Sequence, residues 1–229
     1  MRVIDFHTHI LPKADHGSDC VETSAIQLSY AKAAQIDGII ATSHFYPHRH
    51  EALAFVKRRN DAYARLVESG RIPDGLTIKL GAEVLLCTGL ERLPNLDKLC
   101  FEGTKILLIE LPFSDFIPEY EDSVRALYDM GYEVILAHAD RYPSENIEML
   151  LFPGVKIQLN AEGLCGLIRN KKLYEWIDKD IVVGIGSDIH MTDKKAYKKF
   201  LKAKKKLGKE RFARIMTKSE EIFERIFLM

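Results

Sequence analysis

The stretch MRVIDFHTHILP, residues 1–12, decides the fold. Its apolar residues Val3, Ile4 and Phe6 predict a buried strand that ends in His7 and His9. Side chains two residues apart in a strand point to the same face, about 7 Å apart at a rise of roughly 3.3 Å per residue. Two such imidazoles can bind one metal ion, although a polar strand end exposed to water has the same pattern.

Apolar runs like this first one recur along the whole chain. Most are continuously apolar rather than alternating, as strands buried on both faces are. We expect seven strands, at residues 3–7, 38–44, 77–86, 105–112, 133–140, 155–162 and 181–190.

Amphipathic segments separate these runs and predict helices. Thr217 and Glu220 resemble a capping box that begins the last one. The expected helices lie at residues 20–34, 51–69, 120–130, 144–152, 164–176, 194–207 and 218–227. Strands alternating with helices, with no Gly/Ser/Pro linker, predict one α/β domain over residues 1–229 with a parallel sheet.

Metal-binding or phosphate-binding side chains end each expected strand. In a closed barrel these ends form one ring, so their placement favours a barrel over an open doubly wound sheet. Taken singly, each is an ordinary polar residue, but as a set they predict a metal cluster that activates water. Imidazole and carboxylate without thiolate favour manganese, zinc or iron. The residues are His7, His9, His44, Glu83, Glu110, His138, Asn160, Asp188 and His190.

Composition excludes several other functions. The 33 basic and 33 acidic residues cancel, which argues against a nucleic-acid partner. No apolar run reaches the length of a membrane span, and the first is too short for a signal peptide, so we expect a cytoplasmic protein. The sequence leaves the oligomeric state open, a homo-oligomer included.

The four cysteines do not predict a cysteine phosphatase, a disulfide framework or a zinc knuckle. They lie at irregular spacings without a C-x-x-C motif. A cysteine phosphatase needs five residues between its cysteine and the phosphate-binding arginine. Four residues separate Cys87 from Arg92, and three separate Cys165 from Arg169.

The ordered motifs H-x-H, His-Gly, S-H, G-A-E, E-L-P, A-H-x-x-R-Y, Q-x-N and S-D-x-H resemble those of the PHP (polymerase and histidinol phosphatase) superfamily. The resemblance implies a distorted seven-stranded TIM-like β/α barrel around a trinuclear metal centre. Within the superfamily, H-I-L-P, E-L-P, A-H-x-x-R-Y and Q-x-N-x-x-x-L-x-G resemble the bacterial capsule-type tyrosine phosphatases. Those metal-dependent enzymes dephosphorylate the tyrosine-rich tails of kinases that regulate exopolysaccharide synthesis.

The resemblance also implies roles for individual residues. Two or three divalent ions would be held by three ligand sets: His7, His9, Glu83 and Asp188 around the first ion, Glu83, Glu110 and His138 around the second, and His16, His44 and His190 around the third. Arg141, in AHADRY, matches an arginine that binds the substrate phosphate. We expect Arg141, His44 and Asp188 to be catalytic, with a metal-bridging hydroxide attacking phosphorus.

The chain departs from the capsule-type pattern at four places. His16 stands where those enzymes usually have aspartate, and histidinol phosphatases often have histidine at this position. AHADRY replaces AHPERY, and the segment FYPHRHE carries His48 and His50. Lys194 or Lys195 stands where a basic residue, usually arginine, follows S-D-x-H. We expect Lys194 and Arg49 to contact the substrate beside Arg141.

Other functions remain open. The substrate is either a phosphorylated kinase tail or a small phosphate monoester such as histidinol phosphate. A nuclease of the same superfamily and a non-enzymatic metal-dependent binding module are weaker alternatives.

The lysine-rich run DKKAYKKFLKAKKKLGKER, residues 193–211, predicts an amphipathic surface helix. Tyr197, Phe200, Leu201 and Leu207 recur on one side, with the lysines facing water. A docking surface for an acidic kinase tail or an anionic membrane is the alternative.

Overall fold

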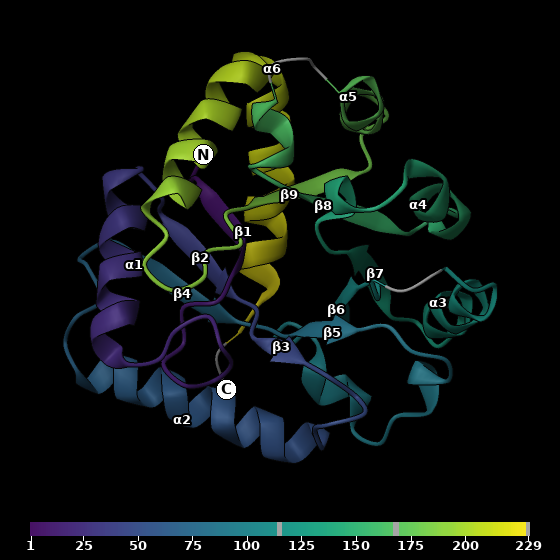
Figure 1. The fold of residues 1–229 in the computed structure, drawn as a ribbon, viewed down its shortest axis with the longest axis horizontal. Helices are drawn as coiled ribbons and strands as arrows, with labels where there is room; N and C mark the ends of the chain where they lie inside the picture. Colours follow the sequence, from purple (N-terminus) through teal and green to yellow (C-terminus); the bar gives the residue numbers. More distant parts are fainter. Residues whose placement is uncertain (114–115, 167–169, 228–229) are drawn as a thin grey trace.

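A computed structural model describes residues 1–113, 116–166 and 170–227, and these contain nine β-strands, all paired in parallel. They form two sheets (Figure 1). The first has the order β1 (Ile4–Thr8), β2 (Gly38–Ala41) and β4 (Thr77–Leu80). The second has the order β3 (His44–Phe45), β5 (Glu83–Leu85), β6 (Ile106–Glu110), β7 (Glu133–Leu136), β8 (Lys156–Asn160) and β9 (Val182–Gly186).

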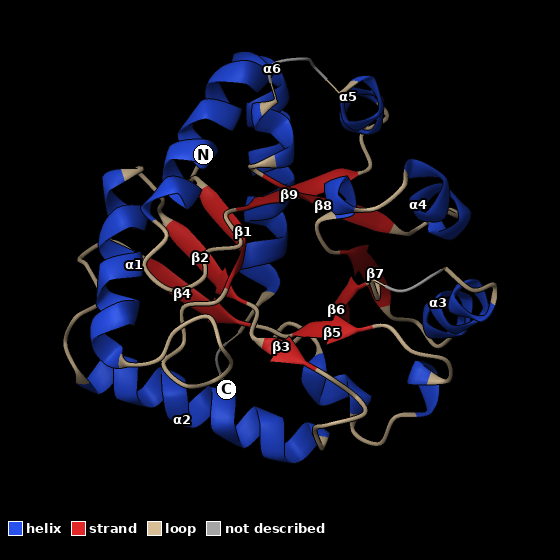
Figure 2. Ribbon diagram, viewed as in Figure 1, coloured by secondary structure: helices blue, strands red, loops and turns tan. Residues whose placement is uncertain are grey.

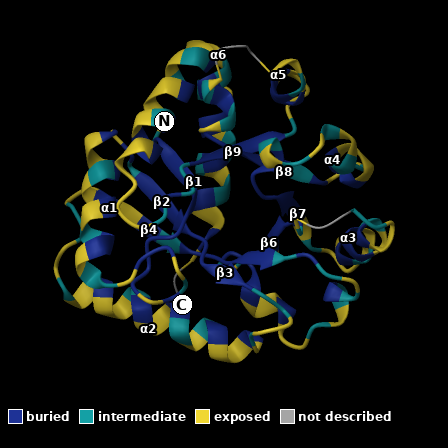
Figure 3. Cartoon of the chain, viewed as in Figure 1, coloured by how far each residue is buried: buried dark blue, intermediate teal, exposed yellow. Residues whose placement is uncertain are grey.

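Helices surround the strands on the outside (Figure 2). The α-helices of the described residues are α1 (Val21–Ala33), α2 (Ala52–Glu68), α3 (Glu119–Asp129), α4 (Ser144–Leu150), α5 (Lys171–Asp178) and α6 (Lys194–Arg225). The strands are buried, while each helix exposes its outward face (Figure 3). This arrangement confirms the predicted parallel α/β architecture.

The strand count differs from the prediction because two expected strands are each interrupted. Residues 38–44 divide into β2 and β3, and residues 77–86 divide into β4 and β5. At the second interruption, a Cβ on Gly81 would lie 2.5 Å from a ring carbon of Phe101, so a side chain does not fit there. Backbone hydrogen bonds nevertheless continue, from Gly81 N to Ala41 O at 2.9 Å and from Glu83 N to Ser43 O at 3.1 Å.

The outer strands β1 and β9 of the two sheets meet where β9 ends. The Asp188 N–H donates to the carbonyl of His7 at 2.9 Å, and the His9 N–H donates to the carbonyl of Ile189 at 3.3 Å. The chain segments that follow β1 and β9 are therefore fixed to each other by their backbones.

An apolar cluster fills the opposite end of the strands, near their N-termini. Ile4 and Phe6 of β1 pack there with Phe101, and Phe223 of α6 belongs to the same fully buried cluster. A Cβ on Gly38, the first residue of β2, would lie 2.8 Å from the Phe223 ring. The C-terminal half of α6 (yellow in Figure 1) thus covers this end.

Two helix predictions were wrong in their bounds. Helix α5 begins at Lys171 rather than 164; residues 163–165 form a short 3-10 turn, and the expected residues 167–169 lie outside the described ones. Helix α6 consists of two helical parts separated at Gly208, whose φ of 75° and ψ of 170° are not helical. The first part ends at residue 207, as predicted, but the second begins directly after Gly208 rather than at residue 218. Thr217 therefore lies inside a helix and does not cap one.

The lysine-rich segment is helical, as predicted, and three of its four apolar residues are buried: Tyr197, Phe200 and Leu207. Leu201 is 42% exposed, so its assignment to the buried face was wrong. Among the described residues, no helix is long and apolar enough to cross a membrane.

Candidate metal centre

A β-bulge in β1 separates the buried apolar residues of this strand from its histidines. One extra residue of β1 lies opposite β2 between Asp5 and Thr8, and such a bulge re-aims the side chains that follow it. Ile4 and Phe6 belong to the apolar cluster, whereas His7 and His9 turn to each other, with their Nε2 atoms 3.0 Å apart. Both histidines are fully buried. The two imidazoles therefore converge in the structure, as the sequence predicted.

The Glu83 carboxylate lies at the centre of the site, at the first position of β5. Its Oε2 lies 2.7 Å from His44 Nδ1 and 3.4 Å from the Nε2 atoms of both His7 and His9. Its Oε1 lies 2.7 Å from His138 Nε2. Four histidines from three different strand ends thus surround one buried carboxylate.

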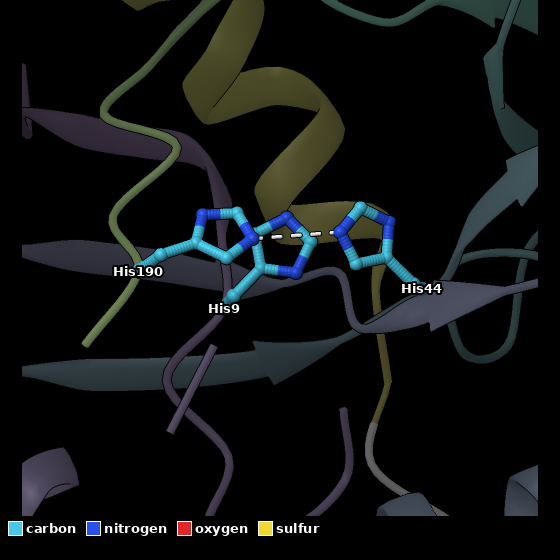
Figure 4. Close-up of side chains that lie close together, drawn as sticks. All are labelled: His9, His44 and His190. Atoms are coloured by element: carbon cyan, nitrogen blue, oxygen red, sulfur yellow. Dashed lines mark hydrogen bonds between the residues drawn. The ribbon is translucent and has the colours of Figure 1, made fainter. Parts of the chain in front are cut away.

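Two further carboxylates and a further histidine complete this cluster. Asp188 Oδ1 lies 3.3 Å from His9 Nε2, and Glu110 Oε1 lies 3.5 Å from His138 Nε2. His190 Nε2 lies 3.4 Å from His44 Nε2. Figure 4 shows the rings of His9, His44 and His190 converging from three separate segments of the chain.

The donor set fits divalent cations. Three groups of residues have ligand atoms within 4.8 Å of one another: His7, His9 and Asp188; His44, Glu83 and Glu110; and His9, His44 and His190. Glu83 Oε2 and His44 Nδ1 are buried without a hydrogen-bond partner among the described residues, although they are 2.7 Å apart. An unsatisfied buried carboxylate oxygen is costly, and a cation bound by both atoms would satisfy them.

This grouping differs from the predicted ligand sets at His138, which belongs to none of the three groups and whose place beside Glu83 and Glu110 is taken by His44, and at His16. His16 also belongs to none of the three groups, which cover the described residues, and its side chain is exposed. Its ring lies 4.8 Å from the ring of His44 and 4.8 Å from that of His190, so it borders the cluster. His9 takes the place beside His44 and His190 that the resemblance gave to His16.

Mutual attraction controls protonation in the cluster. Burial raises the pKa of the Asp188 and Glu83 carboxyls, but the neighbouring histidines outweigh burial and hold both values well below normal. Burial lowers the pKa of His138, yet the hydrogen bonds that its ring donates to Glu110 and Glu83 raise it to about 9. Metal ligation requires neutral imidazole, so a bound cation would displace such protons.

Sequence reasoning missed two residues that orient the histidines. Asp15 accepts hydrogen bonds from His9 Nδ1 at 2.8 Å and from the His44 backbone N–H at 2.9 Å. Gln158 Oε1 lies 3.1 Å from His7 Nδ1 and accepts from the His138 backbone N–H at 2.7 Å. Partners of this kind fix the ring orientation and tautomer of a metal-binding histidine. Gln158 stands in the Q-x-N motif, and Asp15 precedes His16, but neither pattern indicates such a role.

The predicted substrate-binding residues lie in three different surroundings. Arg141, 39% exposed, forms an ion pair with Asp188, and Asn160 Nδ2 donates to the same carboxylate at 2.9 Å. Arg49 is exposed and lines a cavity of about 600 Å³ beside the cluster. Lys194 is the exposed first residue of α6.

Fold and cluster together define the class: a parallel α/β protein with a candidate metal centre where its strands end. The chain belongs to the CpsB/CapC family of capsular polysaccharide synthesis, whose model matches residues 3–224.

Relatives within this class are tyrosine phosphatases. The chain is 30% identical over 206 residues to tyrosine-protein phosphatase YwqE of Bacillus subtilis (strain 168), covering 82% of this chain and 77% of that protein. It is 22% identical over 205 residues to tyrosine-protein phosphatase CpsB of Streptococcus pneumoniae, covering 83% and 84%.

A solved structure shares the fold. A chain from the crystal structures of YwqE and CpsB, described as unique metal-dependent tyrosine phosphatases, aligns with a TM-score of 0.75 at 23% identity. The alignment covers 99% of this chain and 96% of that one.

Proposed function

We propose that this protein is a metal-dependent tyrosine-protein phosphatase. Its substrate would be phosphotyrosine on a kinase that controls capsular or exopolysaccharide synthesis. The buried Glu83 carboxylate surrounded by His7, His9, His44 and His138 carries the proposal, because it is a donor set for several cations beside an accessible arginine. Membership in the CpsB/CapC family supports the same substrate class.

The proposed metal centre holds two or three divalent manganese, zinc or iron ions at the C-terminal ends of a distorted, seven-segment barrel. Its ligands are the nine residues named from the sequence, His7, His9, His16, His44, Glu83, Glu110, His138, Asp188 and His190. When bound, the ions would lower the pKa of a water molecule and neutralise the phosphoryl oxygens.

The chain's own residues bind and orient the phosphate. Arg141 lies in ion-pair contact with Asp188 and keeps part of its guanidinium exposed, so it can donate to phosphoryl oxygens while remaining anchored. Asn160 Nδ2 donates to Asp188 Oδ2, the same oxygen that Arg141 contacts, and so helps to fix this carboxylate. The departing phenolate needs little help from an acid, because the pKa of its conjugate acid is about 10.

The cavity beside the cluster suits an aromatic phosphate ester. Tyr46, Leu85, Pro112 and Phe113 form apolar walls, while Glu110 and His16 of the metal centre line its inner side. A volume of about 600 Å³ lies within the usual range for small-ligand sites. The tyrosine ring would lie against these walls with its phosphate directed to the centre.

Metal replacement with three substrates tests the proposal. The protein is stripped with chelator, reloaded with Mn²⁺ or Zn²⁺, and assayed on a phosphotyrosine peptide, histidinol phosphate and a phosphoserine peptide. The reloaded protein should prefer the phosphotyrosine peptide. Full activity without metal would refute the metal dependence, and a preference for histidinol phosphate would reassign the substrate.

Replacing Arg141 separates phosphate binding from metal binding. Arg141→Ala should lower kcat/KM on the phosphotyrosine peptide by roughly 10²–10³-fold, because a charged donor to the phosphate is lost. Metal content should stay at the wild-type value, since Arg141 is not a ligand. A variant that loses its metal would show that Arg141 holds the centre together instead.

A further inference from the structure

A compact turn at residues 46–50 forms the outer edge of the cavity beside the metal centre. The backbone N–H groups of Arg49 and His50 both donate to the carbonyl of Tyr46 at 2.9 Å. The Tyr46 N–H in turn donates to His50 Nδ1 at 3.1 Å. The His50 ring lies 5.8 Å from that of Phe45, which is fully buried. His50 thus holds the turn in one shape from within.

Two other side chains of this turn, those of His48 and Arg49, point to function rather than to stability. His48 and Arg49 are exposed, and both line the cavity. The Arg49 guanidinium lies 5.8 Å from the centre of the Tyr46 ring, a cation–π distance that holds it over the aromatic wall. Arg49 is therefore placed at the entrance on a preorganised turn.

Arg49 differs from the other arginines in its partners. Each of the others that the structure describes forms an ion pair or donates a hydrogen bond. For Arg49, within the described ranges, the Tyr46 ring is the contact that its guanidinium makes. Its hydrogen-bonding edge is left for a partner from outside the chain.

The cavity lining supports an anionic partner at this place. Its one carboxylate among the described lining residues is Glu110, which faces the metal centre, where bound cations would neutralise it. The outer part of the cavity carries Arg49 and His48 against apolar walls. In a bound peptide, the Cα atom of the residue beside phosphotyrosine lies about 3.8 Å from the phosphotyrosine Cα. When the phosphotyrosine ring lies in the cavity, the side chain of that neighbouring residue therefore reaches the edge formed by the turn at residues 46–50.

We propose that Arg49, presented by the turn at residues 46–50, selects phosphotyrosine substrates that carry an acidic side chain beside the phosphotyrosine. The inference rests on the proposed phosphatase function and adds the sequence context of the substrate. A planar guanidinium matches a carboxylate with two parallel hydrogen bonds, which gives direction as well as charge.

Two peptides test this preference on the full chain loaded with Mn²⁺. They are identical except that phosphotyrosine is flanked by Asp in one and by Asn in the other. The measured quantity is the ratio of their kcat/KM values. The wild type should prefer the Asp peptide by roughly three- to fivefold, the range of an exposed ion pair.

Variants of Arg49 should change this ratio in a graded order. Arg49→Lys should keep part of the preference, Arg49→Ala should bring the ratio close to one, and Arg49→Glu should reverse it. Arg71→Ala is the matched control, because Arg71 is an exposed arginine beyond the far end of α2 that pairs with Glu22. Its ratio should equal that of the wild type.

Each contrary result has a distinct meaning. A wild-type ratio near one, or a ratio that Arg49→Ala and Arg49→Glu leave unchanged, overturns the selection by Arg49 while the phosphatase function stands. Failure of the Mn²⁺-loaded wild type to hydrolyse either peptide overturns both proposals.

Discussion

The two ends of the same strands are built from opposite chemistry. At the N-terminal end, Ile4 and Phe6 pack against Phe223 in a fully buried apolar cluster. At the C-terminal end, only a few residues later in β1, His7 and His9 enter an equally buried cluster of imidazoles and carboxylates. Burying apolar surface stabilises a fold, whereas burying charge costs free energy unless it is paired.

The polar cluster also contains two residues in an unfavourable backbone conformation. His138 and Asp188, both in the polar cluster, have positive φ values of 30° and 50°. Such conformations are unfavourable for residues other than glycine and persist where the surroundings enforce them. The apolar end therefore supplies stability, and the polar end uses part of it to hold ligands in place.

Removing the central carboxylate should have the largest effect, because it should abolish metal binding at the polar end and leave the apolar end intact. Glu83→Ala should abolish bound metal and lower phosphatase activity to background, because Glu83 contacts four histidines of the cluster. The metal-free variant should still unfold cooperatively, since the apolar cluster is intact. Metal content by elemental analysis and urea unfolding measure the two effects; retained stoichiometric metal would contradict the central role of Glu83.

The converse change removes a side chain from the apolar end. Phe223→Ala should lower the free energy of unfolding by about 3–5 kcal/mol, the usual cost of deleting a buried phenylalanine. The folded fraction should still bind metal with the wild-type stoichiometry. Unfolding in urea with and without Mn²⁺ checks this, and a selective loss of metal from folded protein would show that the two ends are coupled.

A smaller effect tests the residues that orient the ligands. Asp15→Asn keeps the shape but weakens the acceptor for His9 Nδ1, so metal affinity should fall by roughly 10–100-fold. Competition with a chelator of known affinity measures this change. Unfolding of the metal-free variant serves as the control, and an unchanged affinity would mean that Asp15 has no influence on His9 as a ligand.

A further expected effect is a pH dependence of the stability of the metal-free protein, caused by His138 in the polar cluster. The pKa of His138 is raised to about 9, so its protonation stabilises the fold below about pH 6.5, and this contribution is lost as the pH rises to 9. The urea midpoint should fall over this range, and His138→Gln should flatten the fall. A midpoint that rises with pH would contradict the raised pKa.

Sequence patterns predicted the strands and the polar cluster better than they predicted contacts between distant segments of the chain. Continuous apolar runs located the strands, and histidines at their ends located the cluster, because both signals depend on neighbours in the chain. The interruptions at residues 42–43 and 81–82 were not predicted, because the close approach of Phe101 to Gly81 is a contact between distant segments. The end of a helix before Gly208 was predicted, but the early start of the next helix was not, because residues 209–217 carry no capping signal before Thr217.

The residues missed in the site follow the same rule. Asp15 and Gln158 act through the far nitrogens of His9 and His7, so their roles depend on ring orientation, which spacing does not reveal. His16 was assigned by resemblance to a ligand set, whereas the structure groups His9 with His44 and His190. Family motifs thus located the cluster, and its division among individual ions stays a prediction.

The hydrogen bonds that join the chain segments after β1 and β9 have a consequence for biosynthesis. The Ser187 N–H donates to the Asp5 carboxylate across 182 positions of the chain, and Asp188 and His190 stand close by. During translation, His7 and His9 are synthesised long before Asp188 and His190. If these residues are the ligands proposed above, a polypeptide that ends before Asp188 lacks two of them and could not hold the complete set of ions.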